Sequence, residues 1–239
     1  ALEYIRRKNL SDLGAKSISI GLWVGQASTP NRRDEAVKAL RELRRSKKEP
    51  LNKFVISMCP WCGAEMGPVK SSRNFPRNAP KVIGYVEQGD TVIYRCPDSD
   101  CEFSDSIPIF VIDEDIYDER PTIIIGTVDK FALLAWRPEI RSLFGIDSRG
   151  RRELSPPNMI IQDELHLISG PLGPMVGLFA GGVVELSSNL RVDPPVKPKI
   201  ISSTATIRRY EEQINALYAR EKAYLFPPPG IEVSDSFFS

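Results

Sequence analysis

Long apolar runs are absent from this sequence. No uninterrupted apolar stretch approaches the roughly 20 residues that a membrane-spanning helix needs, so no membrane span is predicted. The first ten residues also lack the apolar segment of a secretory signal peptide, which predicts an intracellular, cytoplasmic location. Internal repeats and low-complexity tracts are missing as well. The chain starts without Met and ends without a recognisable terminal element, and we expect it to be a piece of a longer polypeptide.

A strong net charge is also absent, since the formal charge of the 239 residues is +1. With 41% hydrophobic and 26% charged residues, the composition fits a globular protein of one or two domains. The even balance conceals an asymmetry, because residues 1–58 hold thirteen Lys or Arg against six acids, 13 − 6 = +7. Acids instead gather at 113–119, which predicts an exposed loop.

Much of the excess positive charge lies in a predicted amphipathic helix within 31–49. Its apolar residues recur at helical spacing, and the remaining face is basic. Two interpretations stay open: a solvated helix surface, or a surface that faces a nucleic-acid backbone. In the second case the candidate contacts are Arg41, Arg44 and Arg45.

Three apolar runs of strand length predict an α/β fold. They lie at 122–127, 159–162 and 199–204, and none alternates polar with apolar residues, which is typical of strands buried on both faces of a parallel sheet. Helix-like segments at 129–143 and 171–190 separate them, as in a doubly wound domain. A further strand is predicted within 16–25.

Residues 52–112 contain short β-like runs separated by turn residues, and all four cysteines lie among them. We therefore predict three segments: 1–51 and 113–239 as parts of one doubly wound domain, and 52–112 as an inserted module. The cysteines form two pairs with short spacings, Cys59-Pro-Trp-Cys62 and Cys96-Pro-Asp-Ser-Asp-Cys101. Four thiolates satisfy tetrahedral Zn²⁺ without an open position, so a structural, zinc-ribbon-like site is favoured over disulfides. A plain metal staple and a contact surface both remain open as roles.

The stretch Met159-Ile-Ile-Gln-Asp-Glu-Leu-His166 runs from a buried strand into two carboxylates and the single histidine. Ligands of doubly wound sheets bind beyond the carboxyl ends of the strands, where Asp163 would hold Mg²⁺ on a nucleoside triphosphate. Glu164 would then orient and deprotonate the attacking water, and His166 would sense the γ-phosphate. Alternatively, the acid pair caps the following helix.

The order of these motifs resembles superfamily 2 helicases. Residues 163–166 match motif II (DExH), and Thr204-Ala205-Thr206 at the end of the next strand resembles motif III. Residues 126–130 resemble motif Ib, which grips a nucleic-acid backbone, so Thr127, Asp129 and Lys130 are candidate phosphate contacts; Thr127 could instead cap a helix. The resemblance implies a RecA-like fold, hydrolysis of ATP with Mg²⁺, and a role for residues 204–206 in coupling hydrolysis to strand movement.

Within that superfamily, residues 163–186 and 226–230 resemble the large DNA helicases of bacterial defence and repair. They are most similar to the helicase subunit of DISARM anti-phage defence systems, and a repair-helicase group whose motif II also reads DELH is a relative. This resemblance implies DNA and ATP as ligands and other subunits of a defence complex as partners. A phosphate cradle of the form G-x-x-x-x-G-K-[ST] is missing from the 239 residues, as is a second RecA-like domain. We expect the chain alone to be inactive. The competing hypothesis is a zinc-bearing scaffold that binds nucleic acid or protein on a non-hydrolysing RecA-like fold.

Overall fold

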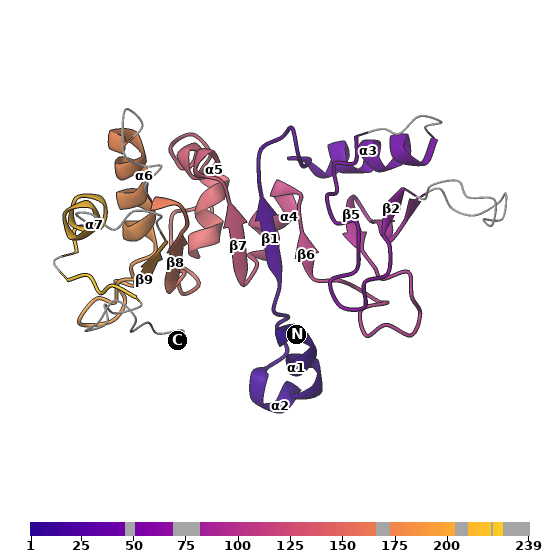
Figure 1. Ribbon diagram of the computed structural model, residues 1–239, viewed down its shortest axis with the longest axis horizontal. Helices are drawn as coiled ribbons and strands as arrows, with labels where there is room; N and C mark the ends of the chain where they lie inside the picture. Colours follow the sequence, from indigo (N-terminus) through magenta and orange to yellow (C-terminus); the bar gives the residue numbers. More distant parts are fainter. Residues whose placement is uncertain (46–50, 69–81, 166–172, 204–209, 221, 227–239) are drawn as a thin grey trace, which may run out of the picture. The chain divides into compact units, whose positions relative to one another are not determined.

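The computed structural model describes residues 1–45, 51–68, 82–165, 173–203, 210–220 and 222–226 (Figure 1). The chain divides into two compact units, Ala1–Glu153 and Leu154–Ser239. Both units mix helices with small parallel sheets. The predicted α/β class is therefore confirmed, whereas the predicted segment boundaries at 51, 112 and 113 stay a prediction. Among the described residues, no helix combines the length and the apolar character that crossing a membrane would require.

The first unit is built on a three-stranded parallel sheet with β1 at its centre, in the order β6-β1-β7 (Figure 1). Gly21 in β1 permits close packing, since a Cβ atom there would lie 3.0 Å from the Pro121 side chain and 3.4 Å from Ile116. The strand predicted within 16–25 is real but shorter than that range. The strand bounds are Ile20–Trp23 for β1, Ile109–Phe110 for β6 and Ile123–Gly126 for β7.

Helix α4 (Asp113–Glu119) replaces the exposed loop that the acidic run predicted. Its three leading acids lie at the positive end of the helix dipole, which favours them there. Ile116 and Tyr117 are buried, and so are Asp113 and Asp115, because each of these carboxylates meets a basic side chain. The loop prediction is wrong because basic partners from other elements allow two carboxylates of this run to be buried in a helix.

A broken helical segment follows β7, where one helix over 129–143 was expected. Pro138 opens a new turn of 3-10 helix after an extended residue, because proline fixes its own backbone and restricts the residue before it. The pieces are α5 (Val128–Ala132) and two 3-10 helices, η1 (Leu133–Ala135) and η2 (Pro138–Phe144).

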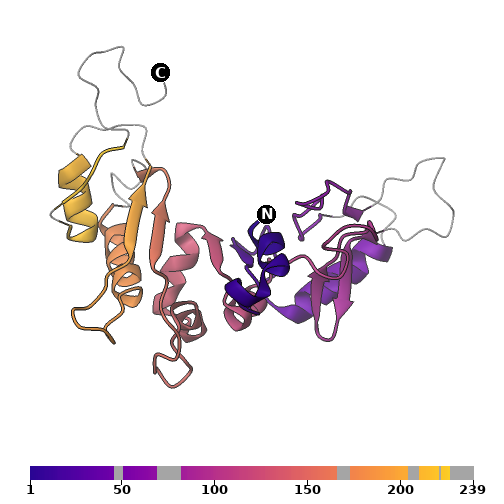
Figure 2. The same ribbon diagram turned by 90° about the horizontal axis from the view of Figure 1, so that it is seen from below.

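The predicted basic helix is present as α3 (Arg33–Arg45). Acids in its first turn and arginines in its last turn suit the helix dipole. Its buried face, Ala36, Leu40 and Leu43, packs on an antiparallel hairpin, β4 (Tyr85–Gln88) with β5 (Thr91–Tyr94). A shorter ladder joins β2 (Gly67–Pro68) to β3 (Val82–Ile83). Residues of α3, β3, β4 and β5 share one core with Cys59, Cys96 and Cys101. Figure 2 shows α3 beside the hairpin from below.

The amino-terminal segment folds into two short helices, α1 (Leu2–Lys8) and α2 (Leu10–Leu13). Within α1, Arg6 and Glu3 form a buried ion pair at 2.7 Å, and both side chains also bond to the chain that enters β1. Arg6 also donates to the carbonyl oxygens of Gly14 and Ala15, and Glu3 accepts the Ile18 N–H at 2.7 Å. These bonds fix where α1 lies relative to the start of the sheet.

The second unit contains a two-stranded parallel sheet, β8 (Met159–Gln162) with β9 (Lys199–Ser202). Helices α6 (Gly173–Leu186) and α7 (Tyr210–Tyr218) cover one face, against Ile160 and Ile200 (Figure 1). The 171–190 helix prediction is thus confirmed for its central part, whereas α7 was not predicted. On the other face, Ile161 is 70% exposed and Ile201 is 44% exposed.

The expectation of one sheet containing all three apolar runs is not met by the strand pairing. Within the described residues, β7 pairs with β1, whereas β8 and β9 pair with each other. Each of the three strands alternates exposed with half-buried residues, which also corrects the prediction of burial on both faces. An apolar run indicates that a strand has a covered face. It does not indicate which other strand will form hydrogen bonds with it.

Candidate metal centre and acidic strand end

The four cysteine sulfurs converge in the first unit. Cys59 Sγ lies 3.9 Å from Cys101 Sγ, and Cys62 Sγ lies 3.4 Å from Cys96 Sγ. All four sulfur atoms lie within 4.8 Å of one another, and none forms a disulfide. A tetrahedron of thiolates around zinc, with bonds of about 2.3 Å, places its sulfurs about 3.8 Å apart. The donor set and its dimensions therefore fit a structural Zn²⁺ ion.

Backbone N–H groups in the first cysteine loop donate to both of its cysteines. The Gly63 N–H donates to the Cys59 carbonyl at 3.0 Å, and Gly63 has a positive φ of 78°, which suits glycine. The Ala64 N–H donates to Cys62 Sγ and lowers the pKa of that thiol. Burial has the opposite effect on Cys96 and raises its pKa.

Tyrosine hydroxyls tie the first cysteine loop to the β4–β5 hairpin. Tyr94 donates to the Phe54 carbonyl at 2.7 Å, and Tyr85 donates to the Ile56 carbonyl at 2.7 Å. Both rings are buried, so these bonds form where water competes little. The cysteine-rich module is therefore a folded part of the first unit with its own core contacts.

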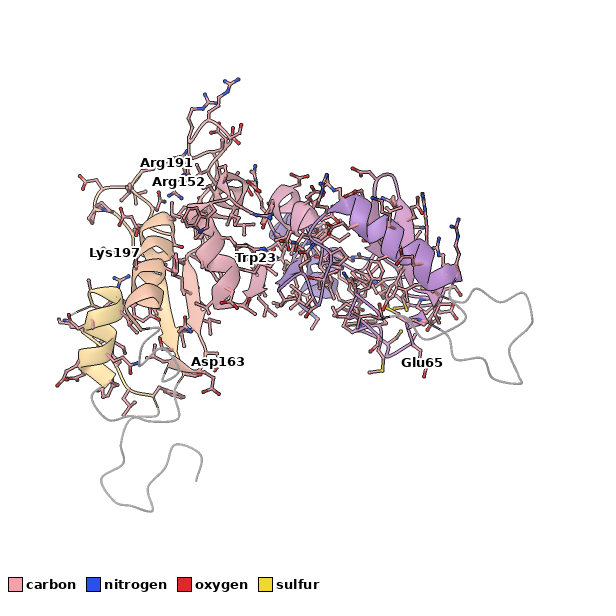
Figure 3. All side chains as sticks on the ribbon, turned by 90° about the horizontal axis from the view of Figure 1, so that it is seen from above. Trp23, Glu65, Arg152, Asp163, Arg191 and Lys197 are labelled. Carbon is pink, nitrogen blue, oxygen red and sulfur yellow. The ribbon has the colours of Figure 1, made fainter. Side chains whose placement is uncertain are left out.

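The acidic pair stands where β8 ends, and Asp163 is labelled there in Figure 3. The Ser203 hydroxyl, at the end of the parallel neighbour β9, donates to the Asp163 carboxylate. The ladder continues past both strands, since the Leu165 N–H donates to the Ser203 carbonyl at 2.8 Å. Asp163 is exposed, and so is Glu164, which has a positive φ of 51°. The Asp163 carboxylate, the Glu164 backbone N–H and the Ser203 hydroxyl thus meet at the carboxyl edge of a parallel pair, where ligands of α/β sheets bind.

The remaining residues of the two helicase-like motifs cannot be placed in the same way. His166 and residues Thr204, Ala205 and Thr206 lie outside the described part of the chain. Ser203 lies inside it and directly precedes Thr204, so the strand that leads to 204–206 does run beside Asp163. The predicted roles of these four residues stay predictions.

The candidate phosphate contacts after β7 differ in exposure. Thr127 and Asp129 are exposed, and Thr127 forms no side-chain cap bond at the start of α5. Lys130 is buried, and its ammonium lies 2.5 Å from an Asp113 carboxylate oxygen and 3.1 Å from the Asn31 side-chain oxygen. This placement favours an internal structural role for Lys130. Thr127 and Asp129 remain candidate contacts.

Two of the three candidate arginines on α3 bond within the protein. Arg41 forms an exposed ion pair with Glu87 at 2.6 Å, and Arg44 donates to the Tyr85 carbonyl at 3.1 Å. Arg45, in the last turn, is exposed. Arg41 and Arg44 therefore help to hold α3 on the hairpin, whatever else they contact.

A buried polar network at the carboxyl end of the first sheet was missed by the sequence analysis. Lys130 pairs with Asp113, Tyr117 donates to Asp113 at 3.4 Å, and the Trp23 indole N–H donates to the Tyr117 hydroxyl at 3.1 Å. Burial raises the pKa of Asp113, and the Lys130 contact opposes that rise. The signal that was overlooked is the apolar pair Ile116 and Tyr117 inside the acidic run, which indicates a packed helix.

Ser203 was also missed, although the register predicts its position. Met159 pairs with Lys199, so the residues four places further along each strand, Asp163 and Ser203, are expected to meet. A hydroxyl in that position stabilises the carboxylate by hydrogen bonding.

No family model matches the sequence. The chain is similar to the DISARM protein DrmA of Bacillus paralicheniformis, with 35% identity over 276 aligned residues that include the whole chain. The alignment covers 23% of DrmA, so the chain spans about a quarter of that relative. Because the alignment includes the whole chain, the chain is related to a segment of a DISARM protein.

Proposed function

We propose that this chain is a segment of an ATP-driven, DNA-processing helicase of superfamily 2 that acts in a cytoplasmic anti-phage defence complex. The similarity to DrmA supports the defence role. The observation that supports the chemistry is the meeting of Asp163, Glu164 and Ser203 at the ends of two parallel strands. The zinc centre has no part in hydrolysis, because four thiolates leave no position for water or substrate.

In the proposed site, Asp163 holds Mg²⁺ on the triphosphate and Glu164 activates the attacking water. Ser203 fixes the orientation of the Asp163 carboxylate through its hydrogen bond. The segment carries no phosphate cradle, so these residues act only together with a phosphate-binding loop elsewhere in the polypeptide. Phosphoryl transfer depends chiefly on such positioning and on neutralisation of charge.

The test is DNA-stimulated ATP hydrolysis by the full-length polypeptide that contains this segment. We expect Glu164→Gln to lower the turnover rate at least about a hundredfold, a typical loss when a general base is removed. Glu185→Gln on the exposed surface of α6 is the matched control and should leave the rate unchanged. Equal rates for the wild type and Glu164→Gln would refute the assignment.

The alternative is a zinc-bearing binding scaffold without hydrolysis, and the convergence of the four cysteines in a folded part of the chain supports it. The helicase and scaffold hypotheses are distinguished by measuring DNA affinity with and without Mg-ATP, at several salt concentrations. The helicase proposal predicts that Mg-ATP changes DNA affinity in the wild type and not in Asp163→Asn. A scaffold predicts DNA or protein binding that is insensitive to Mg-ATP.

A further inference from the structure

Helix α1 lies against the loops of both cysteine pairs. The Tyr4 ring stacks on Trp61, the residue directly before Cys62, with 4.6 Å between ring centres and 26° between ring planes. Trp61 in turn meets the edge of Phe103 at 5.7 Å, and Phe103 follows Cys101 by two residues. Three aromatic rings thus connect α1 to residues from both halves of the metal centre.

Polar contacts join α1 to the second cysteine loop. The Arg7 guanidinium lies 4.5 Å from the centre of the Phe103 ring, within cation–π range. The same group donates to the Glu102 carbonyl at 2.7 Å and to the Ser106 carbonyl at 3.2 Å. Lys8 adds an ion pair with Glu102 at 3.0 Å. Residues 95 to 99 positions apart in the sequence therefore form one interface.

The metal centre fixes the surface on which α1 rests. Residues 59–64 and 96–106 form loops and turns around the sulfurs, and isolated bridges flank them at Met58–Glu65 and Tyr94–Ile107. The Phe103 N–H donates to Cys101 Sγ at 3.5 Å, and the Cys96 N–H donates to the Phe103 carbonyl at 3.0 Å. Four thiolates at these separations repel one another unless a cation lies between them, so zinc binding and the folding of such loops are coupled.

Helix α1 depends on this surface because it is only seven residues long. Isolated helices shorter than about 12 residues are marginal in water, so tertiary contacts must stabilise it. Its other anchor is the Glu3–Arg6 pair, through which Glu3 accepts the N–H of Ile18, two residues before β1. The folding of α1 is thereby connected to the position of the residues that lead into β1.

We propose that the cysteine metal centre is a clamp for the amino-terminal helix: zinc occupancy determines whether residues 2–13 are folded against the module and hold the start of β1. The clamp is a conformational device that does not depend on the proposed ATP site. Its distinguishing property is reciprocity, because a contact that requires bound zinc must also strengthen the binding of zinc.

The first measurement is amide hydrogen exchange of the intact protein with zinc bound and after removal of zinc by a chelator. We expect exchange in residues 2–13 to become faster by on the order of tenfold or more when the metal leaves. Peptides from β8 and β9 serve as the internal control and should not change. Unchanged protection of residues 2–13, with zinc loss verified by elemental analysis, would overturn the proposal.

The second measurement avoids variants that lose the metal. Tyr4→Ala and Arg7→Ala should keep one zinc per chain yet bind it about two- to tenfold more weakly in competition with a chelator, as expected for the loss of one aromatic or cation–π contact. Tyr224→Ala and Arg149→Ala remove exposed side chains of the same types and are the matched controls. Zinc affinities equal to wild type in both α1 variants would reduce the centre to a local staple and refute the clamp.

Discussion

The two parallel sheets of this protein end in different chemistry. At the carboxyl end of β6-β1-β7, the charges of Asp113 and Lys130 are buried and face each other. At the carboxyl end of β8-β9, Asp163 and Glu164 are exposed, with a serine hydroxyl on Asp163. In both sheets this edge is the position where ligands of α/β proteins bind. Position at this edge alone does not make a carboxylate available to a ligand, because Asp113 is buried against Lys130 whereas Asp163 and Glu164 are exposed.

The largest expected effect is on the buried edge. Lys130→Met removes the ammonium and leaves the Asp113 carboxylate buried beside an apolar chain. Breaking a buried ion pair on one side costs about 3–5 kcal/mol of unfolding free energy. Urea denaturation followed by tryptophan fluorescence measures this loss, since Trp23 belongs to the same network. The double variant Lys130→Met/Asp113→Leu should recover most of the loss, and failure to recover it would argue against pairing as the cause.

The same variant should have a pH-dependent deficit. Burial raises the pKa of Asp113, and the loss of Lys130 removes the contact that opposes this rise. A carboxyl group with a raised native pKa binds its proton more readily in the folded state, so the free energy of unfolding increases as pH falls through that pKa. The deficit of Lys130→Met should therefore be full at neutral pH and shrink on acidification. A deficit that stays constant down to pH 4 would contradict a carboxylate origin.

The exposed edge should tolerate the corresponding change. Asp163→Asn keeps the shape of the side chain and one acceptor for the Ser203 hydroxyl, so the loss of unfolding free energy should stay below about 1 kcal/mol. Its effect on ATP hydrolysis by the full-length polypeptide should be far larger. A strong loss of stability in the same urea assay would show that Asp163 holds the fold together, and the contrast between the edges would fail.

The smallest effect is expected at an exposed pair outside both edges. Arg41→Gln breaks the ion pair with Glu87 on the surface of the first unit, where solvent screens the charges. We expect no resolvable change in melting temperature and a slightly smaller salt dependence of DNA binding if α3 faces the nucleic acid. Arg137→Gln, which removes a comparably exposed ion-pair partner, is the control. Equal salt slopes in the two variants would remove Arg41 from the proposed interface.

Local chemistry in the sequence determined several features correctly. The spacing of the four cysteines predicted that they converge, because two short-spaced pairs supply the corners of one tetrahedron. The 3.6-residue period of α3 predicted both the helix and its buried face. The apolar run 159–162 followed by Asp163 predicted a strand with a carboxylate at its end, and the similarity of residues 163–186 pointed to DISARM proteins.

The tertiary structure decided the rest. The residues around Asp113 and Lys130 do not predict that these charges are buried. A charge is stable inside a protein only when it is paired, and the two partners lie seventeen residues apart in the sequence and meet only in the fold. Strand pairing was equally undetermined, because β7, β8 and β9 are similar apolar runs and any of them satisfies another's hydrogen bonds. The docking of α1 on the cysteine loops followed from contacts across about a hundred residues, which no local pattern encodes.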